Sequence, residues 1–120
     1  MIGKPFRGMV VQVGLTPVAG TRQGRSQPCV VIQNDVGNRF SSTTLVVPLA
    51  DAAHIKKPSP IYVLAKKGDG GTAQDSYVLC DQIRTVDQRR FRDVYGALSL
   101  ETMTAVDKAL RVSLGLSTIY

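Results

Sequence analysis

Short runs of β-branched residues, separated by Gly, Pro, Asn and Asp, fill the chain from Gly8 to about Leu98. Runs of this length and spacing are typical of strands in a compact barrel or a strongly bent sheet. The second run, PCVVIQN, is continuously apolar at its centre, so we expect it to be buried on both faces. The pattern predicts strands at residues 9–15, 28–34, 43–49, 60–65 and 76–86.

The hydrophobic pattern changes to a helical period near the C-terminus. Ser99 has the chemistry of an N-cap, and Gly115 is suited to end a helix that begins there. Because the segment is amphipathic, we expect it to pack on the sheet through its apolar face rather than stand free. That face consists of Leu100, Met103, Val106, Leu110 and Leu114.

Length and charge narrow the class of protein. A chain of 120 residues has the size of one domain, which we assign to residues 1–120. Its net charge of +6 favours a polyanionic partner, such as nucleic acid or an acidic protein. We find no apolar run long enough to span a membrane and no signal peptide, and we expect a cytoplasmic protein with Cys29 and Cys80 as buried free thiols.

The side-chain sets of common enzymes are nearly absent from the sequence. The single histidine, His54, cannot form a paired-histidine zinc site, and the GxSxG motif of a nucleophile elbow is missing. The glycines of the loop at 66–75 are not followed by the Lys-Ser/Thr pair of a phosphate-binding loop. We therefore expect no metal and no cofactor, and the residues alone indicate a nucleic-acid-binding module before an enzyme.

Several segments resemble the MazF/PemK family of toxin endoribonucleases. The resemblance is carried by RGMVVQVGLTPVAGTRQG, QPCVVIQNDVGNRFSSTTLVVPL, DSYVLCDQIRTVDQRR and GALSLETMTAVDKAL, in this order. It implies a mainly β fold with a C-terminal helix, the SH3-like barrel that MazF and PemK share with CcdB. It also implies a cytoplasmic homodimer held inactive by an acidic antitoxin. Members of the family cut single-stranded RNA without metal, by attack of a 2′-hydroxyl that leaves a cyclic phosphate.

The resemblance also identifies where this chain departs from the family. The family carries an arginine before the proline that opens the second strand, and this chain has Gln27 there. The Thr or Ser at the end of the third strand corresponds to Ala50, and the glutamate of the preceding loop corresponds to Arg22. Loss of a positive charge beside a developing dianion costs on the order of a few kcal/mol of transition-state stabilisation. We therefore expect weak or absent cleavage of RNA.

Three hypotheses follow from these departures. In the first, the protein is an active nuclease in which Arg22 or Arg25 replaces the missing guanidinium, although most loop arginines are simply solvated. In the second, it binds RNA or an antitoxin without cutting. In the third, it forms mixed dimers with an active relative and supplies no chemistry of its own.

The positions that would bind RNA match the family better than the catalytic positions do. Amide and hydroxyl groups can read the edges of unpaired bases, and lysines in loops can contact phosphates. Asn38 lies in DVGNRF, where a structural role in a turn is at least as well supported. Arg84 and Arg89 can serve as phosphate contacts or as partners in dimer salt bridges. The resemblance implies that Gln23, Asn38, Ser76, Asp81 and Gln82 contact RNA or lie close to it, and the cationic loop adds Lys56 and Lys57 as candidate RNA-binding residues.

Overall fold

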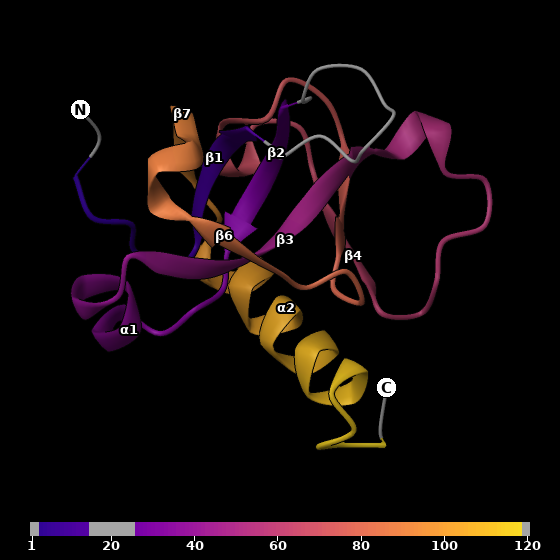
Figure 1. Ribbon diagram of the computed structural model, residues 1–120. Coiled ribbons are helices and arrows are strands. Elements are labelled where there is room, and N and C mark those ends of the chain that lie inside the picture. Colours follow the sequence, from indigo (N-terminus) through magenta and orange to yellow (C-terminus); the bar gives the residue numbers. More distant parts are fainter. Residues whose placement is uncertain (1–2, 15–25, 119–120) are drawn as a thin grey trace, which may run out of the picture.

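The computed structural model describes residues 3–14 and 26–118 (Figure 1). Most of the described elements are β-strands, and the last element is one long helix. The elements are β1 (Met9–Gly14), β2 (Ser26–Val31), α1 (Asp35–Phe40), β3 (Thr43–Asp51), the 3-10 helix η1 (Ala52–His54), β4 (Tyr62–Ala65), η2 (Asp69–Gly71), β5 (Ser76–Leu79), β6 (Arg84–Asp87), η3 (Gln88–Arg90), β7 (Phe91–Ala97) and α2 (Leu100–Ser113).

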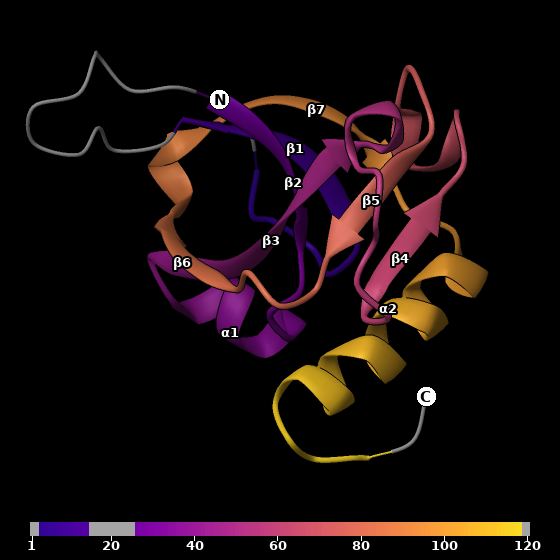
Figure 2. The ribbon, with the colours of Figure 1, turned by 90° about the vertical axis from the view of Figure 1, so that its right-hand side faces the viewer.

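The seven strands form one strongly curved antiparallel sheet. Its order is β4-β5-β3-β2-β1-β7, with β6 beside β3 as well. The long strand β3 pairs with β6 over its first half and with β5 over its last residues, 49–51. Because β6 then continues through η3 into β7 at the other end of the path, the strands enclose a barrel-like space (Figure 2). This confirms the predicted mainly β fold with a C-terminal helix.

Apolar side chains fill both faces of the sheet. Along β2 the side chains alternate, so that Cys29 and Val31 point into the barrel and Val30 points to the other face. This confirms that the second apolar run is buried on both sides. The barrel cluster consists of Met9, Val11, Val13, Cys29, Val31, Val46, Val86 and Phe91. On the opposite face, α2 adds Met103, Val106, Ala109 and Leu110 to a cluster that includes Val30, Val47, Leu49, Val78 and Cys80.

Helix α2 begins where the sequence predicts. The Ser99 hydroxyl accepts a 3.2 Å hydrogen bond from the Thr102 N–H, and Gly115 follows the helix with φ of +76°. Earlier in the chain, turn η2 is held against β7 by a close backbone approach. A Cβ at Gly71 would lie 2.2 Å from the carbonyl oxygen of Tyr95, so that position needs glycine.

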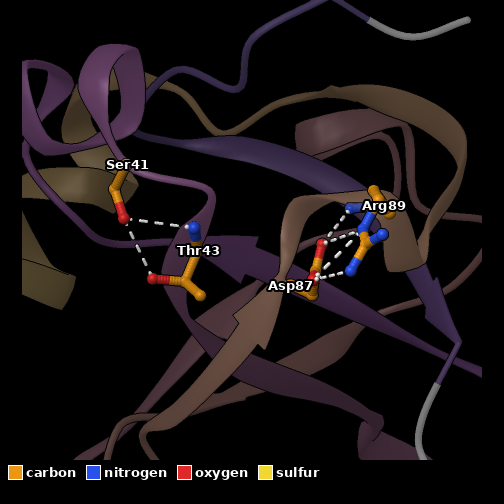
Figure 3. Close-up of polar contacts among 4 residues, drawn as sticks. All are labelled: Ser41, Thr43, Asp87 and Arg89. Atoms are coloured by element: carbon orange, nitrogen blue, oxygen red, sulfur yellow. Dashed lines mark hydrogen bonds and ion pairs between the residues drawn. The ribbon is translucent and has the colours of Figure 1, made fainter.

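The sequence predicts a turn around Gly37 and Asn38, but the structure has helix α1 there. The Asn34 side chain caps it by accepting a 2.8 Å hydrogen bond from the Gly37 N–H, which is why β2 ends at Val31 rather than at Asn34. After the helix, the Ser41 hydroxyl accepts a 3.1 Å hydrogen bond from the Thr43 N–H, and this turn leads into β3 (Figure 3).

Two further strands differ from the prediction. The single run expected at 76–86 is divided into β5 and β6 by a turn, in which the Gln82 N–H donates to the carbonyl of Leu79 at 3.0 Å. The sequence does not predict β7, whose centre is largely solvent-exposed and lacks a clear alternation. It is held in place by its pairing with β1, in which four of the six residues are buried.

Candidate nucleic-acid interface

The register of β2 and β3 relates the two positions at which the sequence departs from the family pattern. The paired residues end at Cys29 and Pro48, and the same register continued by two residues would set Gln27 opposite Ala50. Ala50 in turn pairs with Tyr77 of β5, which pairs with Leu64 of β4. Residues paired in this way point to the same face of a sheet. We call Gln27, Ala50, Tyr77 and Leu64 the Gln27 row.

The Gln27 row is uncharged and partly open to solvent. Its first three side chains are half-buried, and Leu64 is 43% exposed. The ring of Tyr77 contacts that of Tyr62, with centroids 6.3 Å apart and planes at 46°. Amide and aromatic groups side by side can bond to the edge of an unpaired base and cover its face, but they supply no charge to a phosphate.

Below the row, Cys29 offers no nucleophile at neutral pH. Its side chain is 1% exposed, and burial raises the pKa of the Cys29 thiol to about 12, although the charge of Arg84 acts in the opposite direction. Burial likewise raises the pKa of the Cys80 thiol to about 12, with a smaller contribution from Asp81. Both cysteines are free and buried, as predicted from the sequence, and both remain thiols under physiological conditions.

The segment from β6 to β7 carries four arginines, which differ in their partners. Arg89 folds back on Asp87, with its Nη2 atom 2.8 Å from the carboxylate (Figure 3). Hydrogen bonds from Arg89 lower the pKa of Asp87 to about 2, so this pair is ionised and largely neutralises itself. Arg84 and Arg92 are exposed, and within residues 3–14 and 26–118 neither forms an ion pair.

The structure distributes the other predicted binding residues over several places. Lys56 and Lys57 are exposed after η1, and Asp81 and Gln82 are exposed in the turn between β5 and β6. Ser76 is only 3% exposed, and its hydroxyl donates to the carbonyl of Gln74 at 3.1 Å. Arg22, Gln23 and Arg25 lie outside the described residues.

Asn38 is an internal residue of the fold. Its side chain is completely buried; Nδ2 donates to the carbonyl of Gln33 at 2.9 Å and to Asp35 at 3.3 Å. Its Oδ1 accepts from Gln33 Nε2 at 3.1 Å and from the Thr44 hydroxyl at 2.6 Å. The Gln88 amide also donates to the Asn38 carbonyl, at 3.2 Å. These contacts join α1 to β3 and η3 and leave the Asn38 amide with protein partners on all sides.

Sequence reasoning missed a contact on the opposite face of the sheet from the Gln27 row, between Gly14 of β1 and Arg92 of β7. A Cβ at Gly14 would lie only 2.8 Å from Arg92 Nη2. The signal was present, since RRFRD places an arginine next to a residue of the barrel core, but the pairing of Phe91 with Val13 is not visible in the sequence.

The described part of the chain contains no group of three His, Cys, Asp or Glu residues arranged to hold a metal ion. Likewise, no helix in residues 3–14 and 26–118 is long and apolar enough to cross a membrane.

Comparison with known proteins shows the family. Residues 6–114 match the model of the PemK-like, MazF-like toxins of type II toxin-antitoxin systems. This chain is a member of that family. It is 43% identical to the endoribonuclease EndoA of Bacillus subtilis (strain 168) over 111 residues, which cover 92% of this chain and 94% of EndoA. It is 40% identical to the endoribonuclease MazF of Staphylococcus epidermidis over 111 residues, 92% of each chain.

The fold of this MazF-like toxin is also found among solved structures. An endoribonuclease from mycobacterial species, solved in complex with its cognate antitoxin, superposes with a TM-score of 0.73 at 25% identity, covering 97% of this chain and 98% of that one. The agreement along nearly the whole chain includes both the barrel and the C-terminal helix.

Proposed function

We propose that this protein is the toxin of a type II toxin-antitoxin system, that it binds single-stranded RNA across the Gln27 row, and that it cleaves RNA weakly or not at all. The observation that carries the proposal is the register of β2 and β3, whose continuation by two residues beyond the Cys29–Pro48 pair would set Gln27 opposite Ala50. The resemblance to the family assigns an arginine and a hydroxyl to these positions. An amide and a methyl group facing one another can hold RNA, but they cannot stabilise a phosphorane.

The chemistry of the neighbouring residues supports the same conclusion. Cleavage without metal needs a cation at the developing charge and groups that move protons. Cys29, beneath the row, is protonated because burial raises its thiol pKa to about 12. Tyr77 and Leu64 add apolar surface to the row rather than charge. The arrangement therefore suits recognition of RNA better than its cleavage.

The proposed partners are an acidic antitoxin and a second copy of this chain. The net charge of +6 complements an acidic protein, and the mycobacterial relative was solved with its cognate antitoxin. For the second copy we propose an apolar groove of about 500 Å3 beside the C-terminal half of α2. Its wall includes Ile32, Leu45, Ile83, Leu110 and the exposed Leu114 and Leu116. A symmetric pair would cover these leucines.

The test restores the missing groups one at a time. Cleavage of an unstructured single-stranded RNA is measured with EDTA present, and the products are examined for a cyclic phosphate. We expect Gln27→Arg to raise the rate on the order of 10²-fold, because the charge is the larger contribution, and Ala50→Thr to raise it further. Thr104→Arg adds the same charge at an exposed site of α2, which packs on the other face of the sheet, and should leave the rate unchanged.

The rates distinguish the alternatives. If the wild-type protein already cuts as fast as Gln27→Arg, Gln27 is not the defect, and Arg22 or Arg25 becomes the favoured cation. Because Arg22 can occupy or repel the restored guanidinium, we expect the triple variant with Arg22→Glu to be the most active. A triple variant that binds RNA but remains silent would refute this account of the site.

A further inference from the structure

Strand β4 leaves one edge of the sheet without a neighbouring strand. It is the first strand of the path β4-β5-β3-β2-β1-β7, and β5 is its only strand partner in residues 3–14 and 26–118. Figure 2 shows β4 beyond β5, next to α2. An edge of this kind presents backbone donors and acceptors to which another extended chain can add as a further strand.

The backbone of Leu64 faces this free edge. Residues of an antiparallel pair alternate between bonding to the partner strand and pointing away from it. The N–H of Tyr62 donates to the carbonyl of Ser59 at 2.9 Å. The carbonyl of Leu79, opposite Tyr62, accepts from the Gln82 N–H at 3.0 Å. Tyr62 and Leu79 therefore form a pair without mutual hydrogen bonds, and the same phase two residues further on directs the N–H and C=O of Leu64 away from β5.

An apolar cleft of about 210 Å3 lies beside the start of β4, under α2. Ile61 and Val63 form one side of it, and Ala105, Ala109 and Val112 form the other. A strand added beside β4 would direct every second side chain to the α2 face of the sheet, on which Val63 lies. The cleft is large enough for one aliphatic side chain, so it supplies a pocket for one residue of an added strand.

Exposed lysines flank this strand. Lys66 and Lys67 follow β4 directly, Lys56 and Lys57 lie in the loop before it, and Lys108 lines the cleft. Within residues 3–14 and 26–118 none of these five lysines forms an ion pair. Their charges oppose edge-to-edge pairing of two copies of this chain, whereas an acidic chain would meet opposite charge at both ends of the strand.

We propose that the free edge of β4 accepts an extended acidic peptide segment as a further strand, with one apolar side chain seated in the cleft under α2. The inference rests on the proposed function for its acidic partner, and it places that partner beside Leu64, where the Gln27 row ends. A peptide is favoured over RNA because the edge offers backbone groups in strand register, and because the cleft is lined by aliphatic rather than aromatic side chains.

The first test asks whether main-chain pairing holds the peptide. The parent probe is a fluorescein-labelled peptide of about ten residues in which Glu alternates with Val and one central Val is replaced by Leu. Two further peptides carry N-methyl groups on alternate residues, one for each edge of the extended peptide. Fluorescence anisotropy measures the affinities. We expect one of the two methylated peptides to bind about tenfold more weakly than the parent, because it loses its hydrogen bonds to β4.

The second test asks whether the cleft holds a side chain. Ala105→Leu fills the cleft from α2, and it should weaken the parent peptide about fivefold while leaving a peptide with Ala at the central position unchanged. Thr104→Leu is the matched control, because it adds an aliphatic side chain at an exposed position of α2 that does not line the cleft. Thermal unfolding of each variant checks that the fold is retained.

The third test concerns charge. Lys66→Gln combined with Lys67→Gln should weaken the parent peptide about threefold and reduce the salt dependence of its binding. Arg89→Gln combined with Arg92→Gln removes the same net charge next to and within β7, at the other end of the strand order, and should have a smaller effect.

The outcomes separate the inference from the function on which it rests. If both methylated peptides bind like the parent, charge alone holds the peptide and strand addition is wrong. If Ala105→Leu affects the Leu and Ala peptides alike, no peptide side chain occupies the cleft. If no acidic peptide binds while RNA does, the edge site fails and the proposed RNA surface stands. A protein that binds the peptide at β4 but binds no RNA would reverse that result. Equal losses of RNA and peptide affinity in the double lysine variant would assign this edge to RNA.

Discussion

The backbone N–H of Ser99 donates a 2.8 Å hydrogen bond to the carboxylate of Asp69, thirty residues earlier in the chain. The hydroxyls of Ser99 and Thr102 donate to the other oxygen of the same carboxylate. Burial tends to raise the pKa of Asp69, but the hydrogen bonds from Thr102 and Ser99 outweigh it, and the pKa is lower than usual. One carboxylate thus fastens turn η2 to the start of α2.

The first prediction is that Asp69→Asn lowers the free energy of unfolding by about 1–2 kcal/mol at neutral pH, as the loss of a helix cap does. Because the folded pKa is depressed, the stabilisation by Asp69 is present above the unfolded pKa of about 3.9 and is lost as the pH falls through the folded pKa. The difference between wild type and variant should therefore shrink below about pH 4. Urea unfolding at several pH values measures it.

The exposed Asp93 provides the control for this experiment. Asp93→Asn makes the same chemical change without removing a cap, and we expect it to change stability little at any pH. A difference between wild type and Asp69→Asn that persists unchanged in acid would mean that the carboxylate's charge does not stabilise α2.

The second prediction concerns Asn38. Asn38→Ala should destabilise the protein by about 2–4 kcal/mol, because it opens a cavity and leaves the hydroxyl of Thr44 and the amide of Gln33 without their partner. Ser42→Ala, at an exposed neighbouring site, is the comparison. Thermal unfolding measures the loss of stability, and RNA binding is titrated well below the melting temperature. A variant with unchanged stability but weakened RNA binding would instead support the role in RNA contact suggested by the sequence.

The third prediction tests the cationic loop after η1. If RNA crosses Lys56 and Lys57, replacing both with alanine should weaken binding and lower the slope of log K against log salt by about 1.4, or about 0.7 for each phosphate. The pair Lys66 and Lys67 offers a matched double substitution in another loop, and we expect its effect to be smaller. Equal slopes for the two double variants would show that only the net charge matters.

The fourth prediction concerns the proposed homodimer. Leu116 is 75% exposed and lines the groove beside α2, so Leu116→Glu should place a charge in the covered surface and shift the protein towards monomer. Leu100→Glu changes an equally exposed leucine at the other end of α2 and should leave the oligomeric state as it was. Sedimentation velocity at micromolar concentration distinguishes the cases. A wild-type monomer under these conditions would count against the dimer itself.

Much of the fold could be predicted from the sequence, because its signals are local. The apolar run around Val30 and the N-cap at Ser99 each have a pattern that only one kind of element satisfies well. Helix α1 and strand β7 were missed for a common reason. The short helix depends on the Asn34 cap and on a buried amide at Asn38, and β7 depends on pairing with β1. Side-chain capping and pairing between distant strands leave no periodic pattern of apolar residues in the sequence.

The candidate site could be predicted only in part. The resemblance to the MazF/PemK family drew attention to Gln27 and Ala50, which lie two residues beyond the last pair of the β2–β3 register, Cys29 and Pro48. The sequence did not distinguish Arg84 from Arg89, although the structure pairs only the second with Asp87. The arginine beside a core residue in RRFRD did not by itself reveal the contact of Arg92 with Gly14, 78 positions earlier in the numbering.

The two buried thiols provide a way to follow how this molecule opens. Cys29 belongs to the cluster inside the barrel, and Cys80 belongs to the cluster beneath α2. A thiol reagent can modify each cysteine only after the structure around it has opened. The labelling rates of Cys29 and Cys80 therefore report separately on the opening of two regions of one chain. If α2 detaches while the barrel stays intact, Cys80 is modified first. If the molecule opens only as a whole, the two thiols are modified in the same opening event and neither is modified ahead of the other.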